Sequence, residues 1–209
     1  LSLHAYTALQ VQDPQQTWYR YTGVIDSAVL SIKPKGAYFE YGLYLTFSSR
    51  PHTAVYDTFE VQLFFDLPEG SIMHDSWLWV NNQIIQAKII DRVKANLTYE
   101  GIVQRRRDPS ILYKNSATQY ELRVFPLPAN KTRKVKLTWL TPAKWSTGSV
   151  QCPLPMAILK ASAFAPYFQI FSYTDSVWQN PRIPELPGTA FNPSPGNSFT
   201  TATIAGPLI

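Results

Sequence analysis

The chain has 209 residues, a length that supports one hydrophobic core with a small appendage. Aromatic residues make up 14%, and 17 prolines outnumber 9 glycines, a composition typical of a β-rich globular protein and not of a disordered chain. The net charge is +5, and the single cysteine, Cys152, excludes an intramolecular disulfide.

Apolar and polar residues alternate through the first half of the chain, and this period of two predicts β-strands. The clearest strand is 59–67, in which every odd-numbered residue is apolar. Glu60 and Asp66 lie on its other face, about 20 Å apart at roughly 3.3 Å per residue, and are expected to face solvent. The predicted strands of this half are 18–33, 39–47, 59–67, 72–80 and 83–89.

Two short polar sequences predict turns between these strands. Pro34-Lys35-Gly36 separates 18–33 from 39–47. Asn81-Asn82 joins 72–80 to 83–89, because asparagine tolerates the left-handed backbone of a two-residue hairpin. Both faces of this hairpin carry large apolar residues, so both are expected to be covered.

The stretch from Ile89 to Thr141 begins with a predicted helix from about Asp91 to Arg105. Asp91 is a candidate N-cap, and Asp108-Pro109 ends the helix because the residue before a proline is pushed out of the α region. An alternative period-two interpretation of 93–99 as a strand stays open. Two alternating strands follow, at 120–127 and 134–139.

The C-terminal part differs in character. Residues 152–165 predict either a strand or a short helix, and 167–173 predicts a strand. From Trp178 onward, six prolines indicate a linker or a strap laid over the domain. We therefore expect an all-β protein, an antiparallel β-sandwich with one inserted α-helix. Residues 1–147 would form its core, and 148–209 would add strands and the proline-rich segment without forming a separate domain.

Three groups of residues in the central stretch carry a family resemblance. They are Ala95, Tyr99 and Glu100; Asp108, Pro109, Ser110, Ile111 and Leu112; and Phe125 with Pro126. In this order they resemble the VIT domain, named after vault proteins and the inter-alpha-trypsin inhibitor heavy chains, over roughly 24–140. The resemblance implies a β-sandwich with one inserted helix, usually preceding a von Willebrand A domain. It implies no catalytic residues.

The Asp-Pro-Ser-Ile-Leu sequence at 108–112 is similar to that of bacterial VIT proteins linked to exosortase sorting systems. That resemblance implies an extracytoplasmic module, periplasmic or at the cell surface, in a membrane-anchored parent. The chain starts at Leu1 without methionine, so we expect a piece of a larger protein. No segment predicts a membrane span, because the longest apolar stretch, 152–171, is broken by Lys160 and three prolines.

The motifs that support catalysis or metal binding are missing from the sequence. There is no Gly-x-Ser-x-Gly, no His-Glu-x-x-His, no Gly-x-Gly and no Asp-x-Ser-x-Ser. The three histidines, His4, His52 and His74, are widely separated. We therefore predict a protein that is not an enzyme and needs no cofactor or metal. A hydrolase with a site assembled from distant residues stays open.

Exposed arginine and tryptophan residues are the candidate interaction surface, because these types dominate binding hot spots. They are Arg105, Arg106, Arg107, Trp145 and Trp178, with Trp18 as a further loop-side candidate, whereas Trp77 and Trp139 are expected in the core. The predicted function is a non-catalytic protein–protein or interdomain interaction module. Its partner would be a protein or a neighbouring domain of the parent chain, with no nucleic acid expected.

Two alternative functions stay open. Loop aromatics such as Trp145 and Trp178 also suit a carbohydrate-binding module. Residues 88–144 carry a net charge of +9, against −4 for 1–87, so this region could instead bind a polyanion. Several of its charges, including Lys134 and Lys136, alternate with apolar residues, which is typical of a solvated strand face.

Overall fold

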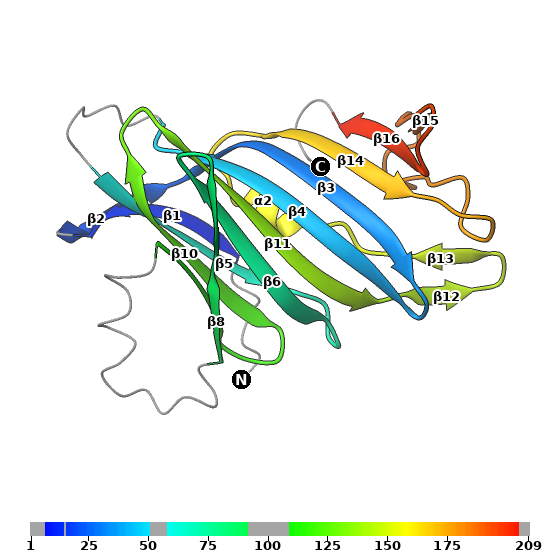
Figure 1. The fold of residues 1–209 in the computed structure, drawn as a ribbon, viewed down its shortest axis with the longest axis horizontal. Helices are drawn as coiled ribbons and strands as arrows, with labels where there is room; N and C mark the ends of the chain where they lie inside the picture. Colours follow the sequence, from blue (N-terminus) through cyan, green and yellow to red (C-terminus); the bar gives the residue numbers. More distant parts are fainter. Residues whose placement is uncertain (1–6, 15, 51–57, 92–108, 205–209) are drawn as a thin grey trace.

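The protein is a β-sandwich of two large sheets in a computed structural model that describes residues 7–14, 16–50, 58–91 and 109–204 (Figure 1). The six-stranded sheet has the order β2 (Gln16–Thr22), β1 (Ala8–Asp13), β5 (Thr58–Asp66), β10 (Gln119–Pro128), β9 (Ser110–Lys114) and β8 (Lys88–Asp91). The eight-stranded sheet has the order β15 (Asn192–Pro193), β16 (Phe199–Ile204), β14 (Tyr167–Tyr173), β3 (Val24–Lys35), β4 (Tyr38–Ser48), β11 (Thr132–Pro142), β6 (Ile72–Val80) and β7 (Gln83–Gln86). The predicted all-β sandwich is confirmed.

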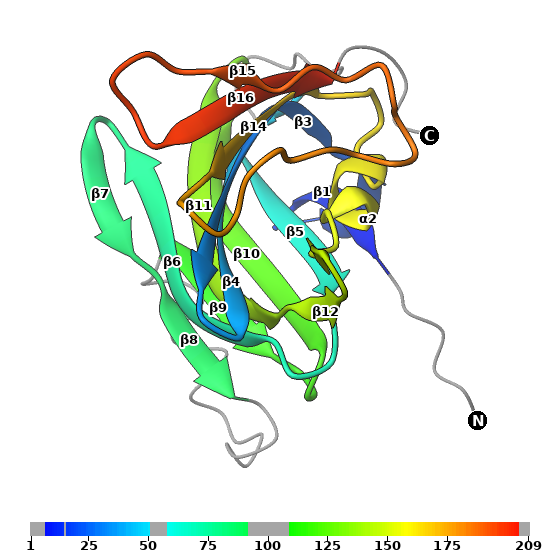
Figure 2. The same cartoon turned by 90° about the vertical axis from the view of Figure 1, so that its right-hand side faces the viewer.

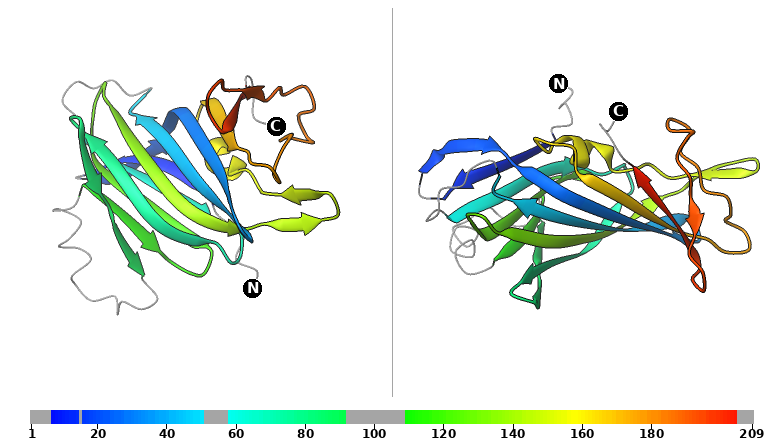
Figure 3. Two further views of the ribbon diagram at one scale, coloured as in Figure 1. Left: turned by 45° about the vertical axis from the view of Figure 1, so that its right-hand side comes forward. Right: turned by 90° about the horizontal axis from the view of Figure 1, so that it is seen from above.

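Two elements lie outside these sheets. A separate hairpin of β12 (Lys144–Ser146) and β13 (Ser149–Gln151) projects from one end of the sandwich (Figures 1 and 3). A short helix, α2 (Met156–Lys160), buries Ile158 and Leu159, so the open question about 152–165 is settled in favour of a helix. No helix in the described ranges is long and apolar enough to cross a membrane.

The core lies between the inner faces of the two sheets. Strand register aligns Leu30, Leu43 and Leu137 side by side in the eight-stranded sheet. It aligns Leu9, Leu63, Leu122 and Leu112 in the six-stranded sheet. All seven leucines are at most 2% exposed. Because burying one leucine contributes about 1.5–3 kcal/mol, the alternation seen in the sequence is what holds the layers together.

Most strand pairs are antiparallel, but two are parallel, so both sheets are mixed. β14 runs parallel to β3, and β8 runs parallel to β9. β16 then pairs with β14, which brings the C-terminal segment into the same sheet as the central strands (Figure 2). Ile183, Leu186 and Phe191 of the proline-rich segment pack against the core, as a strap does.

The predicted 83–89 strand is divided between the sheets. β7 pairs with β6 at the edge of the eight-stranded sheet, and β8 pairs with β9 in the other sheet. Ala87 lies at the crossing, where its N–H donates to the Ser76 carbonyl at 2.8 Å. The expectation that both faces of the hairpin are covered is wrong, since Ile84 on this edge strand is 53% exposed.

The turn predicted at 34–36 begins two residues later than expected. Pro34 and Lys35 continue β3, and the turn begins at Gly36. Pro34 is tolerated there because β14 pairs with β3 only as far as Ile32, so the missing N–H costs no bond to β14.

Apart from Asp91, which ends β8, the predicted 91–105 helix falls on residues 92–108, outside the described ranges.

Candidate functional site

The two tryptophans predicted as interaction residues meet in the folded chain. Trp145 comes from β12, and Trp178 from the loop that follows β14. Their ring centroids are 4.6 Å apart, with an interplanar angle of 64°. This edge-to-face arrangement is one that aromatic pairs prefer, and it lies at the end of the sandwich where the β12–β13 hairpin projects (Figures 1 and 3).

A closed turn holds Trp178 in place. The Asp175 carboxylate accepts the backbone N–H groups of Val177 and Trp178, both at 2.7 Å. The Asp175 N–H in turn donates to the Trp178 carbonyl at 3.1 Å. An aspartate that bonds the backbone two and three residues ahead is a standard turn-forming device, so the Asp-Ser-Val-Trp sequence fixes this loop locally.

The hairpin that carries Trp145 is fixed by its own turn. Gly148 adopts φ +75°, a conformation that glycine reaches without strain, and Ser146 and Ser149 share a hydroxyl hydrogen bond of 2.6 Å. The strands β12 and β13 pair with each other and with neither large sheet.

Trp145, Val177 and Trp178 together form a surface that we name the aromatic end. Trp145 is 56% exposed and Val177 is 71% exposed, whereas Trp178 is half-buried. When a partner covers large apolar side chains of this exposure, the free energy of the complex falls, so these side chains favour binding. Val177 was not singled out from the sequence, because its exposure depends on how the turn presents it.

A shallow groove adjoins the aromatic end. Its volume is about 500 Å³, and its lining includes Asp175, Gln179, Asn180, Asn197 and Phe199. Carboxylates and amides hydrogen-bond to sugar hydroxyls, and an aromatic ring stacks on the C–H face of a sugar. Because these residues come from two loops and β16, sequence spacing gave no signal for the groove.

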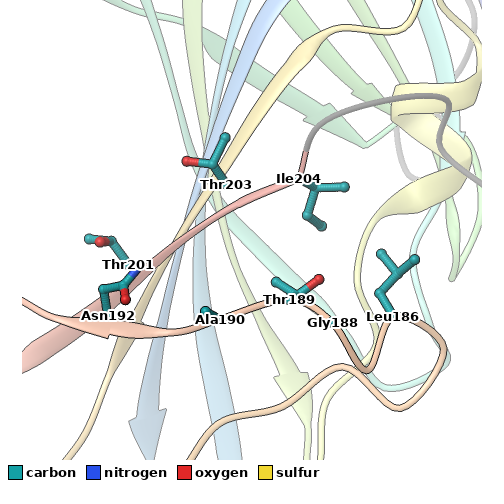
Figure 4. Close-up of a pocket in the computed structure, with 8 residues that line it drawn as sticks. All are labelled: Leu186, Gly188, Thr189, Ala190, Asn192, Thr201, Thr203 and Ile204. Atoms are coloured by element: carbon teal, nitrogen blue, oxygen red, sulfur yellow. The ribbon is translucent and has the colours of Figure 1, made fainter.

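A second groove lies under the strap. It has a volume of about 400 Å³, with Leu186 and Ile204 at one end and the hydroxyls of Thr189, Thr201 and Thr203 along its length (Figure 4). No titratable side chain lines it. Its lining therefore provides neither an acid nor a base for catalysis.

Cys152, the one thiol, is paired with Tyr41 in the interior. Burial raises the pKa of the Cys152 thiol, and the hydrogen bond with Tyr41 lowers it by less. The thiolate is the nucleophilic form, so a raised pKa disfavours reaction. Burial also raises the pKa of Tyr41, whose hydroxyl donates to the Pro153 carbonyl at 2.8 Å. We therefore assign the Cys152 thiol and the Tyr41 hydroxyl a structural role.

A buried charged network lies on the outer face of the six-stranded sheet. Arg123 pairs with Glu121 and lies 3.4 Å from Glu60, and the Glu60 carboxylate accepts hydrogen bonds from Gln12 and Gln62. The Glu60 side chain is only 13% exposed, so the expectation that it faces solvent is wrong. Within the described ranges, no three His, Cys, Asp or Glu side chains form a group that could hold a metal ion.

The family-motif residues that the structure describes lie together at β9 and β10. Leu112 pairs with Leu122 in the core, and the Phe125 N–H donates to the Pro109 carbonyl at 2.9 Å. A cis peptide bond joins Phe125 to Pro126, whose carbonyl accepts from Arg133 at 2.8 Å. These contacts give the motif a structural role.

The other predicted residues fall into two groups. Ala95, Tyr99, Glu100, Asp108 and the arginines Arg105, Arg106 and Arg107 lie outside the described residues, as does the side chain of Trp18. Trp139 is 2% exposed in the core as predicted, whereas Trp77 is half-buried on the outer face of the eight-stranded sheet.

Solved structures with a similar arrangement include two peptidases and a binding protein. Legionella pneumophila aminopeptidase A has a TM-score of 0.45 and 11% identity over 93% of this chain. An M1 zinc metallopeptidase from Deinococcus radiodurans has 0.40 and 12% over 87%. A putative nutrient-binding protein from Legionella pneumophila has 0.45 and 12% over 94% of this chain and 67% of its own.

The alignments span only 21% and 38% of the two peptidases, so they bear on no activity. A comparison with curated proteins gave no match. The family model of the vault protein inter-alpha-trypsin domain matches residues 33–139, just over half of the chain, from the end of β3 to the middle of β11. The chain therefore belongs to the VIT domain family.

Proposed function

We propose that this VIT domain is a non-catalytic interaction module that binds a protein, or a neighbouring domain of its parent chain, through the aromatic end. The observation that carries the proposal is the contact between the exposed Trp145 and the half-buried Trp178, 33 positions apart in the sequence. Tryptophan is enriched at binding hot spots, where a few residues dominate the affinity.

The rigidity of the aromatic end supports the same proposal. The Asp175 turn and the Ser146–Ser149 bond fix the two segments before any partner arrives. Fixed side chains lose less conformational entropy on binding, so each buried ring contributes more to affinity. We further propose, on the family resemblance alone, that the parent protein displays this module outside the cytoplasm.

Site-specific photo-crosslinking in the parent protein tests the proposal. A photoreactive phenylalanine analogue replaces Val177 in one variant and Phe164 in a control, because Phe164 is 58% exposed but lies elsewhere. We expect position 177 to give one defined adduct, identified by mass spectrometry, and position 164 to give none. Trp145→Ala should abolish the adduct. Equal labelling at both positions, or no adduct at 177, contradicts the proposal.

Carbohydrate binding is the second candidate, and the groove beside the aromatic end is what favours it. Gln179, Asn180 and Asn197 offer amide donors and acceptors in a groove that the Phe199 ring also lines. A glycan array with the wild-type domain and with Trp178→Ala separates the two functions. A specific glycan whose signal disappears in the variant supports sugar binding, and an array without signal leaves protein binding.

A further inference from the structure

The outer face of the eight-stranded sheet carries lysines stacked on aromatic rings. Strand register places Tyr44, Lys136 and Trp77 in one row across β4, β11 and β6. The next row along β11 contains Lys134 and Trp79. These side chains point away from the six-stranded sheet, because they alternate with the buried Leu43, Val135, Leu137 and Leu78.

The first group, which we name the Tyr44 cluster, holds two ammonium groups over one ring. Lys134 Nζ and Lys136 Nζ lie 5.1 and 5.2 Å from the Tyr44 centroid. Lys134 Nζ is also 5.4 Å from the Trp79 ring, whose centroid is 6.1 Å from that of Tyr44. Each such cation–π contact contributes about 0.5–1 kcal/mol at an exposed site, so the lysines are held in place.

The second group, the Tyr173 cluster, has one lysine over an aromatic ring on the same face. Lys33 Nζ lies 4.4 Å from the Tyr173 ring. Phe199 packs against Tyr173 and Phe171, each with centroids 5.3 Å apart. Between the two clusters, Ser31, Gly42 and Thr138 are aligned on neighbouring strands. Their side chains are short, but Gly42 and Thr138 are buried, and Lys136 Cε lies 3.5 Å from the Cβ position of Gly42, so the lysine stem covers part of this row.

Two carboxylates, Glu40 and Asp75, lie on the same face, and Glu40 is the cross-strand partner of Lys33. Among the described residues, no carboxylate forms an ion pair with Lys33, Lys134 or Lys136. The Glu40 carboxylate lies 4.0 Å from Lys35 Nζ, with which it forms an ion pair. The Asp75 carboxylate accepts from the Trp77 indole, from Gln86 and from the Ser76 N–H. The lysine ammonium groups are therefore available to an incoming anion.

We propose that this face docks an acidic polypeptide segment, whose carboxylates pair with Lys134 and Lys136 and whose chain runs over the outer face of the sheet toward Lys33. The inference rests on the proposed role as an interaction module but concerns a different surface from the aromatic end. Lysines positioned by rings lose less entropy on pairing than free ones, which favours carboxylate binding.

The arrangement disfavours the other anionic or stacking ligands. Nucleic-acid bases and sugars bind by stacking on open ring faces, whereas the Tyr44 ring is already covered by two ammonium groups. Glu40 and Asp75 on the same face repel a continuous phosphate or sulfate backbone. Separate carboxylates on a polypeptide can be spaced to avoid both.

Fluorescence anisotropy with a labelled Asp/Glu-rich peptide tests the proposal. The variant Lys134→Gln/Lys136→Gln removes the two charges, and Lys131→Gln/Lys160→Gln removes two exposed lysines elsewhere as a charge-matched control. We expect the first pair to weaken binding about tenfold or more, and the control less than about twofold. Thermal melting of both variants checks that they are folded.

Each other outcome overturns the proposal. Equal losses in the two variants mean non-specific attraction, and no binding of the peptide at low salt means that the face does not dock acidic chains. Tighter binding of heparin or oligothymidylate, lost in Lys134→Gln/Lys136→Gln, assigns the face to polyanions instead. The variant Trp145→Ala/Trp178→Ala should bind the peptide normally, so failure at the aromatic end and failure here are distinguished.

Discussion

Tyr41 shows how a single polar atom is accommodated in this apolar core. Its ring is 1% exposed and stacks on Trp139 with centroids 5.0 Å apart, while its hydroxyl donates to the Pro153 carbonyl. Because burial raises the pKa of Tyr41, the hydroxyl keeps the proton that it donates. The bond ties β4 to the segment that enters α2, 112 positions later.

The variant Tyr41→Phe should therefore destabilise the domain. It removes the hydrogen bond to the Pro153 carbonyl, and a bond of this kind contributes about 0.5–1.5 kcal/mol to stability. Tyr44→Phe is the matched control, because Tyr44 lies on the outer face of the same strand, and it should change stability by less than about 0.5 kcal/mol. Urea unfolding of the two variants measures both values, and equal effects would contradict this role of the hydroxyl.

Asp66 gives a pH-dependent prediction. One of its carboxylate oxygens is buried without a hydrogen-bond partner, and burial raises the pKa above 3.8. The folded state therefore binds this proton more tightly than the unfolded state does, so Asp66 lowers stability as pH rises from the unfolded value through the folded one. Asp66→Asn, which has no charge to desolvate, should be more stable than wild type near neutral pH.

The difference between Asp66→Asn and wild type should close below the unfolded pKa of 3.8, where Asp66 is neutral in both states. Urea unfolding at neutral and acidic pH measures this. A difference that is constant with pH would point to a hydrogen-bond effect of the amide and not to the charge.

At the scale of elements, Gly23 is the residue at which the chain passes from the six-stranded sheet to the eight-stranded sheet. It lies between β2 of the six-stranded sheet and β3 of the eight-stranded sheet, and its N–H donates to the Leu9 carbonyl at 3.0 Å. A Cβ at this position would lie 2.8 Å from Leu9 Cγ and 2.9 Å from Val11 Cγ2. Both neighbours are buried.

Gly23→Ala should thus lower the free energy of unfolding by about 1–3 kcal/mol, as overpacking of a filled core does. Gly188→Ala is the control, because a Cβ there meets nothing within 4 Å and the backbone needs no left-handed conformation. Chemical denaturation compares the two. An unchanged midpoint for Gly23→Ala would show that Leu9 and Val11 can rearrange.

Local elements were the part of the fold that sequence reasoning predicted best. The 72–80 strand and its turn are confirmed, with φ of 47° and 64° at Asn81 and Asn82. A turn of this kind depends only on the residues in it. Where β7 ends and β8 begins was not predictable, since the crossing at Ala87 depends on the position of β9.

At the scale of the whole molecule, the C-terminal segment completes the eight-stranded sheet. β14 pairs with β3, and Phe168, Ile170, Ile158 and Leu159 are each at most 1% exposed in the common core. The family model ends at residue 139, before any of these. Burial of this extent indicates that the matched region needs the segment for its stability.

A chain that ends at residue 147 should accordingly melt at a lower temperature than the full chain and bind a hydrophobic dye. The truncation removes both α2 and β14. Loss of β14 uncovers one edge of β3, and loss of α2 uncovers the apolar residues against which it packs. Circular dichroism melting and dye fluorescence measure both effects. A cooperative transition at the full chain's temperature would show that 1–147 is an independent unit.

The sequence by itself determined the class of this protein. Alternation, turn residues and the family motif predicted a β-sandwich with most of its strands, because the period of side chains along a strand and the conformations of asparagine and glycine are local properties. It also named Trp145 and Trp178 separately, from residue type and nearby loops.

Only the tertiary structure decided which distant residues meet. The parallel placement of β14 beside β3, the contact of Trp145 with Trp178 and the burial of Glu60 beside Arg123 all depend on strand order. Strand order is set by the burial of whole faces against each other, and neighbours in a sheet can be any distance apart in the chain. No window of residues contains that information.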